Sequence, residues 1–375
     1  MSAVARPPLE TQDFSHVDLD AFLADLQALR AEINASLGPE DLEHLYKIER
    51  IGRAAAVLGY ATSWMGPNPV SIAGLALGRS TRWLLMHHIG HRGYDKVPDV
   101  PARYTSRVFA RGARRFVDWA DWMLPEAWCY EHNILHHGFT GEEKDPDLIE
   151  RNTEMLRGLP IPRAIKYVFM AGLGMTWKAS YYAPNTLTLL RQRDGKKSSL
   201  AALLGTCYAP YAGLAFVALP LSFAWLGPLA VASAFVNSVS AEIACNLHTF
   251  LVVGPNHTGE DLYRFDDKPG SKGETMLRQV IGSVNYATGT ELLDYAQLWL
   301  NYQIEHHIYP DIPMLQYRKI APKIREICEK HGIPYVQESV FTRARKMLEI
   351  AVGKTSMKRL RQVARAQNRN ARAAA

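Results

Sequence analysis

A stretch of 44 consecutive residues without a charged side chain, residues 198–241, constrains the fold of this chain more than any other feature. A helix needs about 20 apolar residues to cross the hydrocarbon core of a membrane, so this stretch is long enough for two crossings. A Trp-Leu-Gly-Pro sequence at residues 225–228 favours a turn between them. We therefore predict a helical hairpin in the membrane. Two buried core helices of a soluble protein are the alternative, since Tyr208 and Asn237 make the stretch less apolar.

A second uncharged stretch, residues 54–78, is interrupted by Gly-Pro-Asn-Pro at residues 66–69, so neither half is long enough to cross alone. Two crossings would form if the flanking Arg53, Arg79 and Arg82 extend toward the membrane surfaces. A single re-entrant element is the other interpretation.

The rest of the chain is more polar, and the mean hydropathy of -0.15 places only part of the protein in lipid. Residues 1–50 carry apolar positions every three or four residues, which predicts two amphipathic helices. We expect a membrane domain over residues 51–340, with spans near 52–86 and 198–253. Residues 341–375 hold ten Lys/Arg and one acidic residue and should form a basic tail that is solvated or meets anionic lipid. Nucleic acid is not an expected partner.

The cysteines and the start of the sequence indicate the compartment. The four cysteines lie far apart without a Cys-x-x-Cys pair, so neither a disulfide framework nor a thiolate zinc site is expected. The first residues lack an apolar run of signal-peptide length, so we expect no secretory signal. A reducing, cytoplasm-facing setting fits both observations.

Eight of the 13 histidines lie in three short windows. A helix brings residues four positions apart onto one face, so the first two windows should each direct a pair of imidazoles the same way. In the third window a glutamine stands one turn before the last histidine. Neutral imidazole suits iron, zinc or copper, and three such windows favour a metal centre over structural histidines. The windows are His87, His88 and His91; His132, His136 and His137; and Gln303, His306 and His307.

The order of spans and polar segments predicts that the windows share one side of the membrane. Residues 92–131, between the first two windows, are too polar to cross, and the hairpin then crosses twice before the third window. All three can therefore converge on one site. The Lys/Arg-rich segments on this side assign it to the cytoplasm.

The number of imidazoles indicates two metal ions. Seven or eight exceed the three or four ligands of a zinc site. Carboxylate-bridged di-iron proteins use Glu-x-x-His, which does not occur in this sequence. Two irons bound mainly by imidazole, with positions open to O2, suit oxidation of an unactivated C–H bond.

These windows resemble the three histidine boxes of the integral-membrane fatty acid desaturase family. The resemblance extends to Asp-Pro-Asp at residues 145–147 and to residues 300–310, 319–322 and 331–335, and covers roughly residues 50–340. It implies an all-α fold: an integral-membrane bundle of four transmembrane helices with a cytosolic helical cap that holds a histidine-rich di-iron site. It also implies O2-dependent insertion of a double bond into an acyl lipid or acyl thioester. Electrons would come from a separate donor, a ferredoxin, a cytochrome b5 type protein or a reductase.

The resemblance also implies the ligands of the two Fe ions. Another ligand of the family usually follows the fourth transmembrane helix, and here His248 and His257 compete for that role. We favour His257, because its distance from the third window resembles that in the family. Residues expected to contact the ligands are Gln303, which marks the Gln-x-x-His-His branch, His88, Glu305 and Asn301. The expected ligands are His87, His91, His132, His136, His137, His257, His306 and His307, with His248 as the less favoured alternative.

Some features depart from the family pattern. His88-Ile89 stands where the first box often has an acidic residue, which indicates a subfamily with a less usual substrate. No His-Pro-Gly-Gly sequence is present, so we expect no fused cytochrome b5 domain. The same centre could instead hydroxylate, epoxidise or form a ketone on a lipid, terpenoid or alkane, and the mass of the product would distinguish these reactions. A non-enzymatic membrane metal-binding protein is a more remote alternative.

Overall fold

A computed structural model describes residues 14–360, and predictions made for residues 1–13 and 361–375 lie outside the described part. The chain divides into two compact units, each built from separate stretches of sequence. Unit 1 contains Met1–Leu37, Leu135–Met170 and Leu251–Ala375, and unit 2 contains Gly38–Ile134 and Ala171–Phe250. The described residues are predominantly helical with two short strands, in agreement with the expected all-α class.

Unit 2 is built from helices of very different lengths, several of them with 3-10 or π geometry. Its elements are α2 (Pro39–Thr62), α3 (Pro69–Gly90), η1 (Ala102–Tyr104), η2 (Gly112–Arg114), α4 (Arg115–Asp118), α5 (Pro125–Tyr130), η4 (Lys178–Tyr182), α10 (Ala183–Arg193), α11 (Leu200–Leu203), η5 (Leu204–Tyr208), α12 (Ala209–Ala212), η6 (Gly213–Ala218), α13 (Leu219–Leu221) and η7 (Ala224–Leu226). Three elements continue from one unit into the other along the sequence: η3 (Glu131–His136), α9 (Arg163–Trp177) and α14 (Pro228–Val253).

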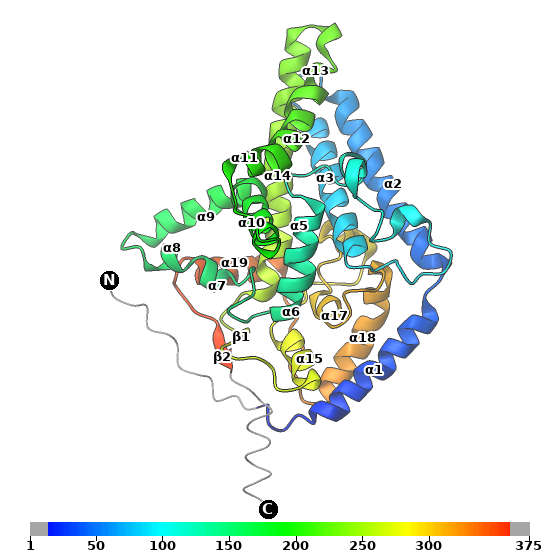
Figure 1. Cartoon of the computed structure of the whole chain (residues 1–375), viewed down its shortest axis with the longest axis vertical. Coiled ribbons are helices and arrows are strands. Elements are labelled where there is room, and N and C mark those ends of the chain that lie inside the picture. The colour runs from blue at the N-terminus through cyan, green and yellow to red at the C-terminus, as the bar shows by residue number, and fades with distance from the viewer. Residues whose placement is uncertain (1–13, 361–375) are drawn as a thin grey trace, which may run out of the picture. The chain divides into compact units, whose positions relative to one another are not determined.

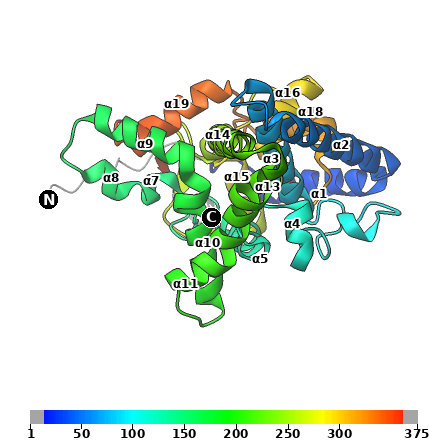
Figure 2. The same ribbon diagram turned by 90° about the horizontal axis from the view of Figure 1, so that it is seen from above.

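Helices α2 and α3 pack side by side through glycines (Figure 1, Figure 2). A Cβ atom on Gly59 would lie 2.6 Å from the backbone nitrogen of Leu75, and one on Gly74 would lie 2.6 Å from the carbonyl oxygen of Ala55. Backbones approach this closely only where side chains are absent, as at small-residue crossings of membrane helices. The Gly-Pro-Asn-Pro sequence ends α2, and Asn68 caps α3 by accepting a hydrogen bond from the Ser71 N–H at 2.8 Å.

The long uncharged stretch forms the predicted hairpin. Two helical runs are long and apolar enough to cross a membrane, Leu200–Leu226 and Pro228–His257. They meet at Gly227, whose φ of 99° is a left-handed conformation that favours glycine. Only 17% of the most apolar window of the first run is buried, which argues against the alternative of two buried core helices. Among the described residues only these two runs meet the criterion, so four transmembrane helices are not established.

Three of the π-helical turns of unit 2 precede a proline. Segments η4, η5 and η6 are followed closely by Pro184, Pro210 and Pro220. The proline ring clashes with the carbonyl four residues earlier, which lies inside the π-helical turn in each case. A wider turn relieves this clash without ending the helix.

Unit 1 combines helices with a two-stranded parallel sheet. Its elements are α1 (Leu19–Ser36), α6 (His137–Phe139), α7 (Ile149–Asn152), α8 (Glu154–Gly158), η8 (Gly254–His257), β1 (Tyr263–Phe265), α15 (Lys272–Ile281), α16 (Glu291–Ala296), α17 (Gln303–Ile308), α18 (Met314–Lys330), α19 (Val340–Ala351) and β2 (Lys358–Leu360). Strands β1 and β2 pair in register from Tyr263 with Lys358 to Phe265 with Leu360. The amphipathic helix α1 packs on α15 and α18 and buries its apolar face there.

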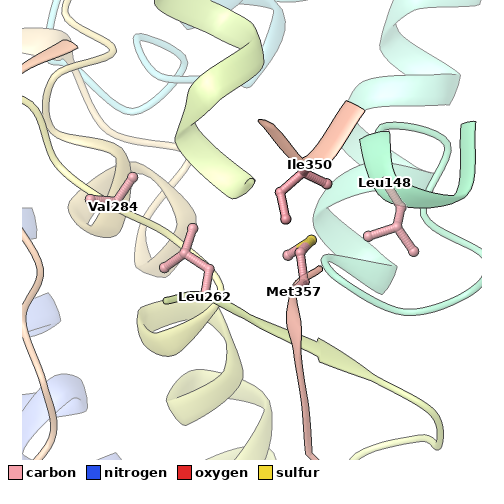
Figure 3. Close-up of a cluster of buried hydrophobic side chains, with 5 residues drawn as sticks. All are labelled: Leu148, Leu262, Val284, Ile350 and Met357. Atoms are coloured by element: carbon pink, nitrogen blue, oxygen red, sulfur yellow. The ribbon is translucent and has the colours of Figure 1, made fainter. Parts of the chain in front are cut away.

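The described part of the expected basic tail packs into unit 1. Figure 3 shows Ile350 and Met357 in an apolar cluster with Leu148, Leu262 and Val284. Residues 340–360 therefore contribute to the core of this unit.

Candidate metal centre

Three histidines of unit 2 form one potential metal-binding group. His87 and His91 lie at the end of α3, and His132 lies in η3. Each ring offers a nitrogen, and these nitrogens lie within 4.8 Å of one another. All three side chains are buried. The spacing of four residues in an α-helix brings His87 and His91 together, as predicted.

Trp128 holds this group in place. Its ring stacks on His132 with centroids 4.8 Å apart and also lies 5.5 Å from the ring of His87. Gly90 makes room for the indole, because a Cβ atom there would come within 2.8 Å of Trp128. The side-chain amide of Asn133 donates a hydrogen bond to the Gly90 carbonyl at 2.8 Å, which links the second histidine window to the end of α3.

The second histidine window adopts π-helical geometry, which the sequence did not predict. In a π-helix the hydrogen bond runs from residue i to i+5, which widens the turn, but residues four apart still lie on about the same face. We expected His132 and His136 to point together. A ring nitrogen of His132 lies within 4.8 Å of one of His136, so the two imidazoles do come together, and His136 also belongs to a three-histidine group of unit 1. Unlike η4, η5 and η6, segment η3 has no proline just after it.

Unit 1 contains the second group, His136, His257 and His307, whose ring nitrogens also lie within 4.8 Å of one another. The ring of His137 stacks on His307 with centroids 4.2 Å apart, and the ring of His306 lies 4.8 Å from His137. Five of the predicted histidine ligands therefore gather in this unit. His257 belongs to the group because η8 follows directly after α14 and places it there.

Four of these imidazoles have a partner at Nδ1. The partner atoms are Asp145 Oδ1 for His136 at 2.9 Å, the Gly282 carbonyl for His257 at 3.0 Å, the Tyr317 hydroxyl for His306 at 3.1 Å and Gln279 Oε1 for His307 at 2.8 Å. For His136, His257 and His307 the partner oxygen can only accept, so Nδ1 carries the proton in the neutral ring. The Tyr317 hydroxyl donates its own hydrogen to the Tyr309 carbonyl at 3.2 Å and so accepts from Nδ1 of His306. Nε2 is then the atom left with a lone pair for a metal ion. Such outer partners fix the tautomer and orientation of metal-ligating histidines.

Asp145 and Gln279 are themselves held in orientation. Asp145 accepts backbone hydrogen bonds from Gly141 at 2.8 Å and Asp147 at 2.9 Å. The amide nitrogen of Gln279 donates to the His137 carbonyl at 3.1 Å, which turns its oxygen toward His307. The acceptors beside His136 and His307 are thus rigidly placed.

The atoms present fit a metal ion. Nε2 of His307 is buried, and no hydrogen-bond partner for it exists among the residues that the structure describes. A buried polar atom without a partner is costly unless something else binds it. Burial, together with the surrounding imidazoles, lowers the pKa of His307 well below its usual range, so the ring is the neutral form that metals bind. Burial would also lower the pKa of His136, but the Asp145 carboxylate outweighs it and raises that pKa.

Gln303 contacts a predicted ligand, as expected. Its amide nitrogen lies 2.8 Å from Nε2 of His257, and its amide oxygen accepts a hydrogen bond from the Asn256 side chain at 2.9 Å. The Asn256 contact fixes the orientation of the amide, so Gln303 presents an N–H group to His257.

The other predicted residues lie away from the two groups. Nδ1 of His248 lies 3.0 Å from the Ser80 hydroxyl, and His88 is buried with its ring 5.1 Å from that of His87. Neither belongs to a metal-binding group found within residues 14–360. The buried Glu305 accepts hydrogen bonds from Asn285 and Tyr335, both at 2.8 Å.

Asn301 is also buried, and its side chain donates to Asp294 at 2.6 Å. Glu305 and Asn301 thus brace the backbone around α17, and their side chains bind groups other than imidazoles.

Sequence reasoning missed several residues that position the imidazoles. Gln279 and Tyr317 belong to no spacing pattern, because they approach the histidines only through the tertiary fold. Trp128 stands one helical turn before His132 and Asn256 directly precedes His257, so the sequence held a signal for both. Asp145 stood in the Asp-Pro-Asp motif, so a signal for it existed, but its contact with His136 was not foreseen.

Comparison with known proteins finds similarity to fatty acid desaturases. A family model described as fatty acid desaturase matches residues 62–339. An NADPH-dependent stearoyl-CoA 9-desaturase of Mycobacterium tuberculosis is 24% identical over 352 residues, which cover 87% of this chain and 78% of that protein. An sn-1 linoleoyl-lipid 6-desaturase of Arthrospira platensis is 25% identical over 232 residues, 57% of this chain and 60% of that protein.

A shorter and more similar match involves an acyl-lipid (8-3)-desaturase of Rebecca salina, 50% identical over 48 residues, which cover 13% of this chain and 11% of that protein. The family match covers well over half of the residues and includes all three histidine windows. On these grounds, the chain belongs to the fatty acid desaturase family.

Proposed function

We propose that this protein is an O2-dependent, di-iron fatty acid desaturase that introduces a double bond into a long acyl chain. The single observation that carries the proposal is the presence of two buried three-histidine groups in a chain of the fatty acid desaturase family. Each group has the number of imidazoles that one metal ion requires from a protein while leaving positions open.

In this proposal His87, His91 and His132 hold one iron, and His136, His257 and His307 hold the other. His137 and His306 supply further imidazoles in unit 1. Iron with O2 supplies the oxidising power to remove hydrogen from an unactivated C–H bond, which side chains alone cannot do. The chain's own residues keep the imidazoles correctly turned, because Asp145, Gln279 and Tyr317 hold the Nδ1 protons, and burial excludes water.

The overall reaction requires a reductant. Removal of two hydrogens from the acyl chain supplies two of the four electrons that reduce O2 to water. The other two electrons and two protons come from an external donor, a ferredoxin, a cytochrome b5 type protein or a reductase. Gln303 supports a place for this protein in the Gln-x-x-His-His branch of the family.

The membrane arrangement is part of the proposal. Helices α2 and α3 would add two crossings to the hairpin, giving four transmembrane helices within a domain spanning residues 51–340. The site would face the cytoplasm, and convergence of the three windows remains the prediction made from the sequence. The exposed apolar side chains of the hairpin, such as Trp225 and Leu229, support contact with lipid.

The substrate is proposed as an acyl thioester or an acyl lipid. Similarity to a stearoyl-CoA desaturase supports the thioester class, and similarity to a linoleoyl-lipid desaturase supports the lipid class. The test is to express the full chain in a host with a simple fatty acid profile and to analyse fatty acids in the thioester and lipid fractions by mass spectrometry. A new product two hydrogens lighter than its precursor, formed only with O2 and a reductant, is expected.

Matched variants connect the product to the two groups. His87→Ala and His307→Ala should each abolish the product and lower the iron content of purified protein from about two ions per chain to about one. His248→Ala should retain both iron ions. A product heavier by one oxygen would instead identify a hydroxylase or epoxidase. Full iron content in both ligand variants would overturn the assignment.

A further inference from the structure

Unit 2 contains a network of buried charges that belongs to neither three-histidine group. Glu242 lies on α14, within the apolar run Pro228–His257, and Arg79 lies on α3. Lys178 begins η4, and Asp121 lies between α4 and α5. All four side chains are buried. Ionisable groups within apolar helical runs are costly and commonly have a function, so we examined what this network connects.

The carboxylate of Glu242 is the centre of the network. It pairs with Arg79 at 3.2 Å and with Lys178 at 3.3 Å. It also accepts hydrogen bonds from the indole N–H of Trp122 at 2.8 Å and from the side-chain amide of Asn246 at 2.9 Å. Hydrogen bonds to a carboxylate are directional and strong, so these partners hold fixed positions around Glu242.

Arg79 connects the network to the helix that carries two of the imidazoles. It stands eight residues before His87 on α3, roughly two helical turns, and the same helix ends at His91. The Arg79 guanidinium also donates to the carbonyl and the hydroxyl of Ser238, at 2.7 and 2.6 Å. Both Ser238 and Glu242 belong to α14, so Arg79 fixes α3 against that helix.

Two consecutive residues connect the network to the segment that leads to the third imidazole. Trp122 binds Glu242, and Asp121 pairs with Lys178 at 2.9 Å. This segment, residues 119–128, is therefore attached to both α14 and η4.

Two tryptophans at the ends of this segment extend the connection to His132. Trp119 packs edge-on against Trp128 with ring centroids 6.1 Å apart, and Trp128 stacks on His132. Both indoles are fully buried. In a close-packed interior neither ring can shift without displacing its neighbours, so the position of the segment affects the position of the imidazole.

Segment η4 supplies a second connection to the same histidine. It begins at Lys178, which pairs with Glu242, and ends at Tyr182. The Tyr182 hydroxyl donates a hydrogen bond to Glu131 at 2.8 Å, and Glu131 directly precedes His132. The network therefore reaches the backbone on both sides of the contact between Trp128 and His132.

We propose that Glu242 is a positioning residue for the metal ion of the three-histidine group of unit 2. One carboxylate joins the helix that carries His87 and His91 to the segments that support His132, so it sets the spacing of the three imidazoles. Catalytic groups must be held to within about 0.5 Å, which directional hydrogen bonds achieve. Apolar contacts in the same place would often stabilise the fold as well as buried charges do, so a role in geometry accounts better for the charges. The inference rests on the proposed function, because it takes these histidines as metal ligands.

The test isolates each metal site in the full-length protein, purified in a mild detergent. Glu242→Gln is introduced into two backgrounds: His307→Ala, which disables the group of unit 1, and His87→Ala, which disables that of unit 2. Co²⁺ is the probe, because its visible absorption depends on the geometry of its ligands and its binding requires neither O2 nor substrate. Tyr211→Phe is the matched control. The Tyr211 hydroxyl also donates to Glu242, but it lies in the run Leu200–Leu226, which carries none of the three histidines.

In the His307→Ala background we expect Glu242→Gln to weaken Co²⁺ binding about 10-fold and to change the absorption spectrum. In the His87→Ala background the same change should leave affinity and spectrum as they were. Tyr211→Phe should alter neither site. Equal weakening of both sites would mean that Glu242 only stabilises the fold, and would overturn the proposal.

Unchanged binding after Glu242→Gln in the His307→Ala background would contradict this inference alone. Failure of both backgrounds to bind Co²⁺ would contradict the proposed metal centre and this inference with it. If Glu242→Gln does not fold, Trp122→Phe decides, because it removes one donor to the carboxylate and leaves the charges of the network in place. It should weaken binding in the His307→Ala background only, and equal binding with and without this change would overturn the proposal.

Discussion

Gln303 and His257 meet through their side-chain nitrogens: Nε2 of the amide lies 2.8 Å from Nε2 of the imidazole. Nδ1 of His257 faces the Gly282 carbonyl, so Nε2 is the atom with the lone pair. In the structure described, the amide N–H of Gln303 binds the lone pair that we assign to a metal ion. Gln303 therefore competes with the metal ion for Nε2 of His257. It does not act as an additional metal ligand.

This relationship predicts the effect of Gln303→Leu. The change removes the nearer acceptor of the buried Asn256 amide, at 2.9 Å, and leaves the Leu300 carbonyl at 3.3 Å. It should cost about 1 kcal/mol of unfolding free energy, measured by thermal denaturation. The iron content should not fall, because a competitor for His257 has been removed. Gln27→Leu, at an exposed amide of α1, is the control. Loss of iron equal to that in His257→Ala would show that Gln303 is itself a ligand.

A second prediction concerns the carboxylate behind His136. Asp145→Asn removes the negative charge 2.9 Å from Nδ1 of His136 and should weaken iron binding about 10–100-fold, as loss of such outer partners generally does. Iron retention during dialysis against a chelator measures this effect. Asp20→Asn, at an exposed position of α1, is the matched control. Equal retention by wild type and Asp145→Asn would contradict an orienting role.

The parts of this protein that the sequence predicted are those determined by local composition and spacing. The hairpin follows from an uncharged stretch of sufficient length, and the pairing of His87 with His91 follows from α-helical spacing. The end of α2 and the start of α3 follow from Gly-Pro-Asn-Pro, because glycine and proline terminate helices.

Other features depend on tertiary contacts and could not be predicted this way. The second window adopts π-helical geometry, and no proline follows it to explain that geometry. The Nδ1 partners Gln279 and Tyr317 are brought to the histidines only by folding of unit 1. Composition alone likewise indicated a basic tail after residue 340, whereas Ile350 and Met357 pack into a core (Figure 3).

A third prediction tests the crossing of α2 and α3. Gly74→Ala would place a methyl group 2.6 Å from the Ala55 carbonyl and 2.9 Å from the backbone of Gly59, so the helices must separate. We expect a loss of about 1–3 kcal/mol and a lower melting temperature in detergent. Gly172→Ala is the control, because the space around Gly172 is open and alanine favours the helix by up to about 1 kcal/mol. Similar melting temperatures for the two variants would contradict the close packing.

The last prediction concerns the pH dependence of the ion pairs that bind α19 to the rest of unit 1. Asp261 accepts hydrogen bonds from the fully buried Arg343 at 2.7 Å and from Lys346 at 2.8 Å. Burial alone would raise the pKa of Asp261, but these two cations outweigh it and hold the pKa below its usual value of about 3.9. A carboxyl group whose pKa is lower in the folded state stabilises the protein above its unfolded pKa, and this contribution is lost as the pH falls through the folded pKa.

Asp261→Asn should therefore lower the melting temperature at neutral pH, with a loss of about 2 kcal/mol, because Arg343 loses a charged partner while buried. The difference between wild type and the variant should stay constant from pH 7 down to about 5 and shrink below about 4. Glu326→Gln, at an exposed position of α18, should show no such dependence. Melting curves of the three proteins across this range measure the effect. A difference that persists unchanged at pH 3 would mean that Asp261 contributes through packing rather than through its charge.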